Sequence, residues 1–452
     1  EGKQEFTDWL MGLNMNQSKL WMILGDFNFI RSPDNRNKPG GDPASMMTFN
    51  NIIVNLDLAE IPLKGRAFTW TNKQDQPLLE KLDWIFTSPH WTTIHPSTMA
   101  TPLAKISSDH VPIKIQIDSN IPRSQIFRFE EYWTEFSGFI ETVEKHWLNS
   151  THFSDSAKNL NSKFKSIRRG LKSWSKQYSQ LNKIIDNCCF YVKLFDGIEE
   201  QRPLARVEKN FRKLLIKHTN KLLEAKRIYW RIRANIRWAN LGDENTKFFH
   251  AIATYVFRHN YITYLMTMDG QQVFDHDHKA AILWASFKDR IGTETICTQN
   301  FDISHLAMEE DLYDLDRPFS NDEIDDIINK MPNDKSPGPD GFNGLFMKKC
   351  WHIIKHYFYK FINDFYNEAV SLAPVNTAYI TLIPKNDNPE IPDDYRPISL
   401  VSMPIKILTK LLANRVQQII ISRISKNQYG FIKTRNIQDC LAWSFEYIHM
   451  CH

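Results

Sequence analysis

Residues 394–400 (DYRPISL) follow residues 383–385 (IPK) across a short polar loop. The apolar run that ends at Pro384 predicts a strand, so Lys385 and Arg396 stand on either side of a loop between strands. A lysine acts as a point charge and an arginine as a bidentate fork, and together they can close over a triphosphate. Taken by themselves, the two residues are more simply interpreted as surface cations beside a turn.

Three more motifs lie around this loop. They are residues 335–341 (KSPGPDG), 428–431 (QYGF) and 434–439 (TRNIQD). In this order, from about residue 331 to the end, the set closely resembles the fingers of reverse transcriptases from non-LTR (LINE-type) retrotransposons, especially those of flowering plants. The resemblance implies that Lys385 and Arg396 contact the phosphates of the incoming nucleotide. It also implies that Gln428 and Arg435 lie near template and nucleotide.

The resemblance implies a reaction as well. Residues 238–250 (WANLGDENTKFFH) match the family's region between nuclease and polymerase. In target-primed reverse transcription the nuclease nicks DNA, and the polymerase then copies the element's RNA from the new 3′ end. The family holds Mg²⁺, or Mn²⁺ in its place, on carboxylates of the palm. The chain ends at His452, before those motifs, so we expect an internal fragment that does not polymerise by itself.

A second group of polar residues lies beside the strands that apolar patterns predict at residues 20–24, 67–71, 82–86 and 111–117. The motifs are residues 25–28 (GDFN), 81–83 (KLD) and 107–110 (SSDH). Hydrolysis of a phosphodiester needs a metal ion, a carboxylate that activates water, and a cation-like group on the phosphate. Asp26, Asp83, Asp109 and His110 supply these residue types. Each motif alone is more typical of a turn or a helix cap.

As a set, these motifs resemble the C-terminal half of the endonuclease/exonuclease/phosphatase family. The resemblance implies that Asp26 activates or orients the attacking water and that Asn28 helps to hold the phosphate or that water. It makes Asp109 a metal-side carboxylate, and it places His110 on the scissile phosphate with Asp83 orienting it. The family's principal metal-binding glutamate would lie upstream of the first residue, so nuclease activity is expected to be absent or feeble.

Positive charge is concentrated between residues 158 and 237, where 21 Lys and Arg stand against 6 Asp and Glu. Apolar residues in the same region recur at 4-3 spacing, which predicts two long antiparallel helices with a turn between Asp196 and Pro203. The alternative is a pair of ordinary core helices. The first seam consists of Leu160, Phe164, Ile167, Leu171, Trp174, Tyr178, Leu181, Ile185, Cys188, Val192 and Phe195. The second consists of Leu204, Val207, Phe211, Leu214, His218, Leu222, Ala225, Tyr229, Ile232 and Ile236.

A basic helical arm of this kind is an electrostatic footprint for nucleic acid. The cations that we expect to contact the phosphate backbone are Arg168, Arg169, Lys172 and Lys176. Binding through them would be independent of sequence and steeply dependent on salt. DNA and RNA are therefore the expected partners.

The composition is that of an ordinary globular protein, with 42% hydrophobic and 24% charged residues. Neither a membrane span nor a secretory signal is evident, and six cysteines without paired spacing favour a reducing compartment, nucleus or cytoplasm. No small-molecule cofactor is expected. The alternatives to the enzyme are a non-enzymatic nucleic-acid-binding remnant and a small-molecule phosphoesterase, and the polymerase motifs disfavour the second.

The patterns predict an α+β multidomain chain. Its expected parts are a partial αβ-sandwich nuclease (1–118), a linker (119–157), the basic coiled-coil arm with a connector (158–258), a mixed connector (259–330) and partial right-hand polymerase fingers (331–452).

Overall fold

The protein is described from a computed structural model that covers residues 2–12, 20–105, 108–117, 126–178, 180–234, 246–292, 315–386, 388–430, 432 and 434–451. The chain divides into two compact units. The first comprises Glu1–Gln125, Leu181–Glu294 and Thr381–Ile398, and the second comprises Ile126–Gln180, Thr295–Ile380 and Ser399–His452. Both helices and small sheets are present, so the class is α+β, as expected.

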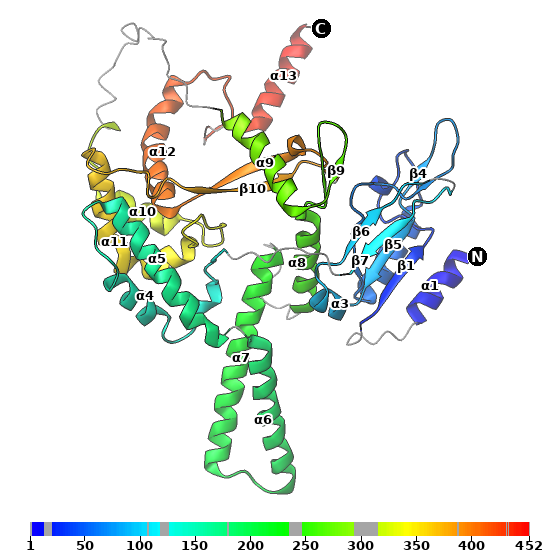
Figure 1. The fold of residues 1–452 in the computed structure, drawn as a ribbon, viewed down its shortest axis with the longest axis horizontal. Coiled ribbons are helices and arrows are strands. Elements are labelled where there is room, and N and C mark those ends of the chain that lie inside the picture. Colours follow the sequence, from blue (N-terminus) through cyan, green and yellow to red (C-terminus); the bar gives the residue numbers. More distant parts are fainter. Residues whose placement is uncertain are drawn as a thin grey trace. The chain divides into compact units, whose positions relative to one another are not determined.

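The first unit begins with a small layered domain (Figure 1). Its helices are α1 (Gly2–Gly12), α2 (Pro43–Asn55), α3 (Pro89–Ile94) and the 3₁₀ turn η1 (Pro33–Asn35). Its strands are β1 (Met22–Asp26), β2 (Ala59–Glu60), β3 (Trp70–Thr71), β4 (Leu79–Glu80), β5 (Asp83–Thr87), β6 (Met99–Pro102) and β7 (Ile113–Gln116). The three-stranded sheet has the order β1-β5-β2, and β3-β4 and β6-β7 form separate antiparallel pairs.

Alternation along β5 explains why this sheet is covered on both faces. Trp84 and Phe86 join a core with Phe49 and Ile52 of α2, whereas Ile85 joins a second core with Ala100 of β6. Successive side chains of a strand point to opposite faces, so one strand serves two layers. The strands predicted at residues 20–24, 67–71, 82–86 and 111–117 are present with shifted or shorter bounds. The domain boundary expected after residue 118 lies outside the described residues.

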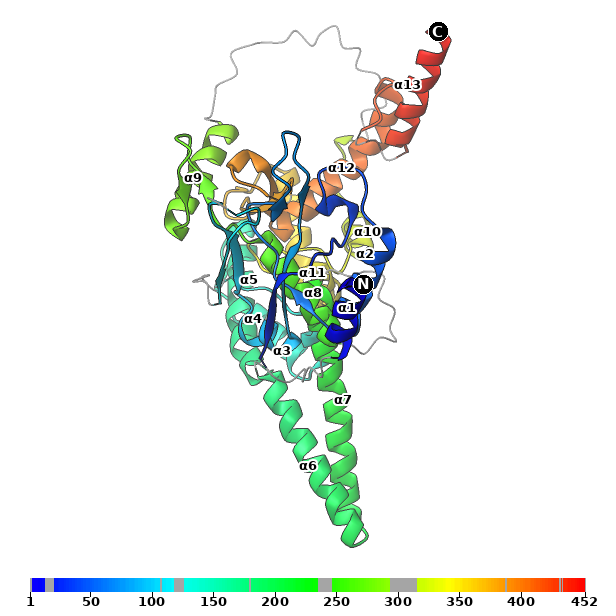
Figure 2. The same ribbon diagram turned by 90° about the vertical axis from the view of Figure 1, so that its right-hand side faces the viewer.

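The first unit continues with the helical arm and a connector. These are α6 (Leu181–Gln201), α7 (Arg206–Ala234), α8 (Thr246–Asn260), β8 (Leu265–Met266), β9 (Gln272–Val273) and α9 (His276–Ile291). Figures 1 and 2 show α6 and α7 side by side as a long antiparallel hairpin. The turn between them falls at residues 202–205, because α6 runs on through Asp196 to Gln201.

The expectation of one unbroken first helix from Leu160 to Phe195 is wrong. The structure has α5 (Ser156–Trp174), then the 3₁₀ turn η3 (Ser175–Tyr178), and then α6. The helix α5 belongs to the second unit, where Leu160, Phe164 and Leu171 are buried in the core. For this half of the seam the alternative interpretation, an ordinary core helix, describes the structure.

The second unit is built around aromatic residues. Its elements are η2 (Glu131–Glu135), α4 (Phe139–Leu148), α5, η3, α10 (Asn321–Lys330), α11 (Gly344–Tyr366), α12 (Met403–Arg423) and α13 (Ile437–Cys451). Phe342 packs on Phe346 with ring centroids 4.0 Å apart and on Phe164 at 5.3 Å, and Phe129 reaches Phe346 at 5.3 Å. Residues 126–157 therefore form part of this core, which corrects their assignment to a linker.

The strands β10 (Ala378–Pro384) and β11 (Tyr395–Val401) form a two-stranded sheet, with the 3₁₀ turn η5 (Pro392–Asp394) between them. The strand predicted to end at Pro384 is confirmed as β10. A capping box starts α10, in which the side chains of Ser320 and Glu323 each accept the other residue's backbone N–H. None of the described helices combines the length and apolar character needed to cross a bilayer.

Candidate functional site

Two antiparallel strands bring the first pair of candidate catalytic residues together. Asp26 ends β1 and Asp83 begins β5, and the register pairs the two residues directly. The indole of Trp84 donates a hydrogen bond to the carbonyl of Phe29 at 2.8 Å, which fixes the chain that leaves β1. Side chains that emerge at one end of a strand pair necessarily share a small region of surface.

His110 completes this group. Its Nδ1 lies 2.9 Å from Oδ2 of Asp83, and its Nε2 lies 3.7 Å from Oδ2 of Asp26. A carboxylate only accepts hydrogen bonds, so Asp83 favours the ring tautomer that carries its proton on Nδ1. The second ring nitrogen is thereby directed toward Asp26, in a partly exposed position that a phosphate oxygen can reach.

Asn28 lies beside Asp26. Its backbone N–H donates to Oδ1 of Asp26 at 2.9 Å and its side-chain amide donates to Oδ2 at 3.1 Å. The φ of Asn28 is 55°, a left-handed conformation that asparagine tolerates better than most residues. The motif at 25–28 thus orients both the carboxylate and the amide toward the same surface.

Asp109 is held by a contact that the sequence patterns did not reveal. The indole Nε1 of Trp70 donates to Oδ2 of Asp109 at 3.1 Å. The backbone N–H of Asp109 itself and this indole hold the pKa of the carboxyl below its usual range, so the group is an anion at neutral pH. The strand pattern at 67–71 was visible in the sequence, but nothing in it linked Trp70 to residue 109.

Thr69 is a second missed residue. Its Oγ1 accepts hydrogen bonds from the backbone N–H groups of Leu82 and Asp83, each at 3.0 Å. The structure thus brings together Asp26, Asn28, Asp83 and His110. Asp109 directly precedes His110 in the chain, and its carboxylate accepts a hydrogen bond from Trp70. Ser107 of the same motif lies outside the described residues.

These side chains do not by themselves make a metal site. Among the residues that the structure describes, no three His, Cys, Asp or Glu side chains are grouped as metal ligands. Mg²⁺ needs near-octahedral oxygen coordination, yet both oxygens of Asp26 are bonded to Asn28 and one oxygen of Asp109 is bonded to Trp70. The assignment of Asp109 as a metal ligand stays a prediction, and no chemical step is derived through a metal.

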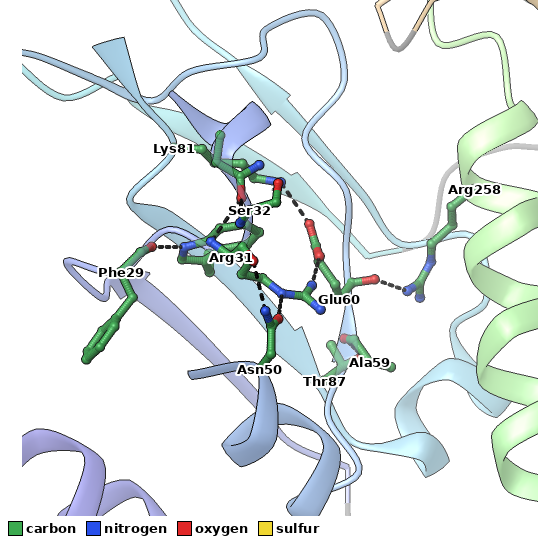
Figure 3. A network of polar contacts seen from close by, with 11 residues as sticks. Phe29, Arg31, Ser32, Asn50, Ala59, Glu60, Lys81, Thr87 and Arg258 are labelled. Carbon is green, nitrogen blue, oxygen red and sulfur yellow. Dashed lines mark hydrogen bonds and ion pairs between the residues drawn. The ribbon is translucent and has the colours of Figure 1, made fainter. Parts of the chain in front are cut away.

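A network of partly buried charges centres on Glu60 of β2 (Figure 3). Its carboxylate pairs with Arg31 and, at 2.8 Å, with Lys81. Arg258 of α8 is almost fully buried, and its guanidinium reaches the carbonyls of Pro96 at 3.3 Å and of Glu60 and His95 at 3.5 Å. Burial lowers the pKa of Arg258 to about 10. Arg258 therefore fastens α8 to the layered domain.

Lys385 and Arg396 lie on the β10–β11 hairpin. The backbone N–H of Lys385 donates to the carbonyl of Asp394 at 2.7 Å, so Arg396 lies two residues further along the opposite strand. Residues two apart share a face, so the two cations lie on one face as diagonal neighbours, roughly 7–8 Å apart between backbones. Both are exposed, and Nζ of Lys385 bonds the carbonyl of Asp393 at 2.6 Å.

Arg435 has a different environment from the one expected of a nucleotide ligand. Its guanidinium donates to four backbone carbonyls, at distances of 2.5 to 3.3 Å. The acceptors are Ile421, Ile424, Ser425 and Gln428. Ile421 is in the last turn of α12 and the other three acceptors follow its end, so Arg435 caps that helix. Gln428 is exposed, and its side-chain amide donates to the carbonyl of Gly430 at 3.2 Å.

The motif at 335–341 supports the start of α12. Asp340 is buried, accepts the N–H of Phe342 at 3.2 Å and also accepts the N–H of Met403. Burial raises the pKa of Asp340. A Cβ on Gly338 would lie 2.2 Å from the carbonyl oxygen of Val401, so only glycine fits there.

A groove of about 1010 Å³ runs between α10 and α12. Lys330, Lys406 and Lys410 line it together with polar residues of α12 such as Asn414 and Gln417. Burial lowers the pKa of Lys406, and the nearby Asp340 opposes that shift. Asp326 also lines the groove and pairs with Lys330 at 2.7 Å, so Lys406 and Lys410 supply its excess positive charge.

The four cations expected on the arm lie elsewhere. Arg168, Arg169 and Lys172 are on α5 and Lys176 is on η3, all in the second unit. Arg169 and Lys172 are exposed, but Arg168 is half-buried and donates to the carbonyl of Pro339. The break after Trp174 separates these residues from the α6–α7 hairpin.

Comparison with known proteins adds evidence for the polymerase motifs. Residues 383–451 match the family described as reverse transcriptase (RNA-dependent DNA polymerase). This segment of the chain is therefore similar to reverse transcriptases. A Xenopus laevis protein, the "Transposon TX1 uncharacterized 149 kDa protein", is 23% identical over 438 residues, or 92% of this chain. The chain spans about a third of the length of that relative.

Proposed function

We propose that the chain is part of a LINE-type retrotransposon protein that carries out target-primed reverse transcription. The observation that carries the proposal is the match of residues 383–451 to reverse transcriptases, which includes Lys385, Arg396 and the residues around Arg435. In this proposal Lys385 and Arg396 bind the triphosphate of the incoming nucleotide. Asp340 and Arg435 act as positioning residues at the two ends of α12, and the lysine-lined groove takes the backbone of a nucleic acid.

The nuclease half of the proposal rests on the group around His110. Asp83 orients the imidazole at 2.9 Å, and this leaves Nε2 directed outward toward a phosphate. Asp26 and Asn28 lie on the other side of that position and would orient the attacking water. The group supports cleavage of a phosphodiester in DNA, with the metal ion that the family uses as an added requirement.

Triphosphate binding tests the polymerase half. A fluorescent deoxynucleoside triphosphate is titrated with the chain, and anisotropy gives the dissociation constant. Lys385→Gln and Arg396→Gln are each expected to weaken binding about tenfold, because each removes a charge-assisted hydrogen bond to phosphate. Lys360→Gln is the matched control, since Lys360 is an exposed cation on α11 that pairs with Asp364 at 3.0 Å. Equal affinities for all four proteins would refute the assignment.

Nicking of supercoiled plasmid in Mg²⁺ or Mn²⁺ tests the nuclease half. Any nicking should disappear in His110→Ala. Nicking that persists in this variant would show that these residues do not carry it. Absence of both triphosphate binding and nicking, with nucleic-acid binding retained, would favour the non-enzymatic remnant instead.

A further inference from the structure

The α6–α7 hairpin buries the inner part of the seam that its sequence predicts and leaves the outer part of α7 exposed. The residues of the hairpin that are buried between the helices include Ile185 and Cys188 of α6 and Thr219, Leu222 and Ala225 of α7. Over the outer half of α7 the predicted seam consists of Val207, Phe211, Leu214 and His218, and all four are exposed. The exposed fractions of Val207, Leu214 and Phe211 are 79%, 64% and 47%.

An apolar stripe is thus open to solvent on one side of the arm. On α6, Tyr191 and Leu194 are each 48% exposed. The ring of Phe211 lies 5.9 Å from that of Phe195, a residue of the α6 seam. Tyr191 lies four residues before Phe195 on α6, so these two rings are neighbours on the surface of that helix. Tyr191, Phe195 and Phe211 therefore form one surface across the two helices.

Cations surround this surface. Between residues 181 and 234 there are 13 Lys and Arg and 6 Asp and Glu. Four of the six acids are paired with arginines, namely Asp196, Glu199, Glu208 and Glu224. Lys193 follows Leu194 in the chain, and Lys213 and Lys217 lie next to and one turn from Leu214, all three exposed. A second copy of so basic an arm would be repelled, whereas a polyanion would be attracted.

Aromatic rings set among lysines are the features with which proteins bind unpaired nucleotides. Bases stack on the rings, and the cations follow the phosphates. A duplex keeps its bases stacked internally and would meet only the cations. The open stripe therefore fits one class of polyanion, a single-stranded nucleic acid.

We propose that the outer half of the arm binds single-stranded RNA or DNA. Bases stack on Tyr191 and Phe211, Leu214 contacts a further base, and Lys193, Lys213 and Lys217 contact phosphates. This inference rests on the proposed function, because it names the form of nucleic acid that the arm of the retrotransposon protein takes. It places the recognition of unpaired strand on α6 and α7 rather than on the cations of α5.

The test compares a fluorescein-labelled dT₂₀ strand with a 20-base-pair duplex, measured by anisotropy on the whole chain. The double variant Tyr191→Ala with Phe211→Ala is expected to lose about tenfold or more in affinity for dT₂₀ and to keep its affinity for the duplex. Tyr191→Trp with Phe211→Trp should restore dT₂₀ binding. Trp284→Ala removes an exposed aromatic ring from α9 and serves as the matched control. Circular dichroism shows whether the alanine variant keeps its helices.

The outcomes separate the two proposals. If the alanine double variant loses affinity for dT₂₀ and for the duplex to the same extent, or loses affinity for neither probe, the stacking surface is overturned. The proposed function would remain intact in both cases. A wild-type chain that self-associates in sedimentation, and becomes monomeric in the alanine variant without losing dT₂₀ affinity, would show that a second copy covers the stripe and would overturn the inference. A wild-type chain that binds neither probe would count against the proposed function itself. Selective loss with rescue by tryptophan supports the inference.

Discussion

Removing the Asp340 carboxylate should loosen the start of α12. In Asp340→Ala the backbone N–H groups of Phe342 and Met403 lose their acceptor in a buried position. Each unsatisfied buried donor costs about 1–3 kcal/mol, and loss of the buried charge offsets part of this sum. We therefore expect a net loss of about 2 kcal/mol, which corresponds to roughly thirtyfold more frequent opening of the first turn of α12.

Hydrogen exchange measured by mass spectrometry reports this opening directly, without assuming a single unfolding transition for the whole chain. The peptide that contains Met403 should exchange roughly thirtyfold faster in Asp340→Ala, while peptides from α4 remain unchanged. Asp334→Ala is the control, because Asp334 is an exposed acid in the same loop. If the Met403 peptide exchanges at the wild-type rate, Asp340 does not hold this helix and its proposed positioning role is wrong.

The same residue predicts a pH dependence. Burial raises the pKa of Asp340 above its value in the unfolded chain. A raised pKa means that the stability from the protonated form is present below the unfolded pKa and is lost as pH rises through the folded pKa. Asp340→Asn cannot titrate, so the pH dependence of exchange at Met403 should flatten in this variant. A slope equal to that of the wild-type chain would refute the assignment.

Three further predictions concern contacts in the two units. Gly170→Ala should destabilise the packing of α5 on α4, measured as a lower urea midpoint, because its Cβ would lie 2.2 Å from the ring of His146; an unchanged midpoint would contradict this. Trp70→Phe should raise the pKa of Asp109 toward its usual range in a carboxyl NMR titration. The ionised carboxylate stabilises the fold at higher pH, so in this variant that stability should already be lost at a higher pH than in the wild-type chain. An unaltered titration would exclude the indole as a cause. Arg258→Met should speed hydrogen exchange in α8 relative to α9, and equal rates would mean that the buried guanidinium does not anchor the helix.

Local patterns in the sequence predicted the strands, whose positions depend on the alternation of neighbouring residues and on turn residues. Apolar runs located β5 and β10, and the spacing of polar residues after strands was enough to group Asp83 with His110. Strand ends are set by short-range alternation and turn residues, so chemistry placed there is visible from the sequence.

The failures involve contacts between distant segments. A 4-3 repeat fixes which side of a helix is apolar, but it does not say which neighbour covers that side. Leu171 is buried in the second unit, whereas Phe211 in the same kind of repeat is exposed. The capping role of Arg435, the network of Glu60 and the bond from Trp70 to Asp109 each depend on tertiary neighbours that have no signature in the chain.

The central claim is that the β10–β11 hairpin holds a nucleoside triphosphate for copying RNA. The most direct test measures binding of a labelled RNA template annealed to a recessed DNA primer, with and without the next matching deoxynucleoside triphosphate. A triphosphate held beside the primer end contacts both the chain and the hybrid, so the two bindings are coupled. Because this coupling is reciprocal, the triphosphate should raise the affinity of the chain for the hybrid. The account predicts that the triphosphate tightens hybrid binding in the wild-type chain and in Lys360→Gln. In the double variant Lys385→Gln with Arg396→Gln, the triphosphate should leave the affinity for the hybrid unchanged. Tightening that persists in the double variant, or that is absent from the wild-type chain, would contradict it.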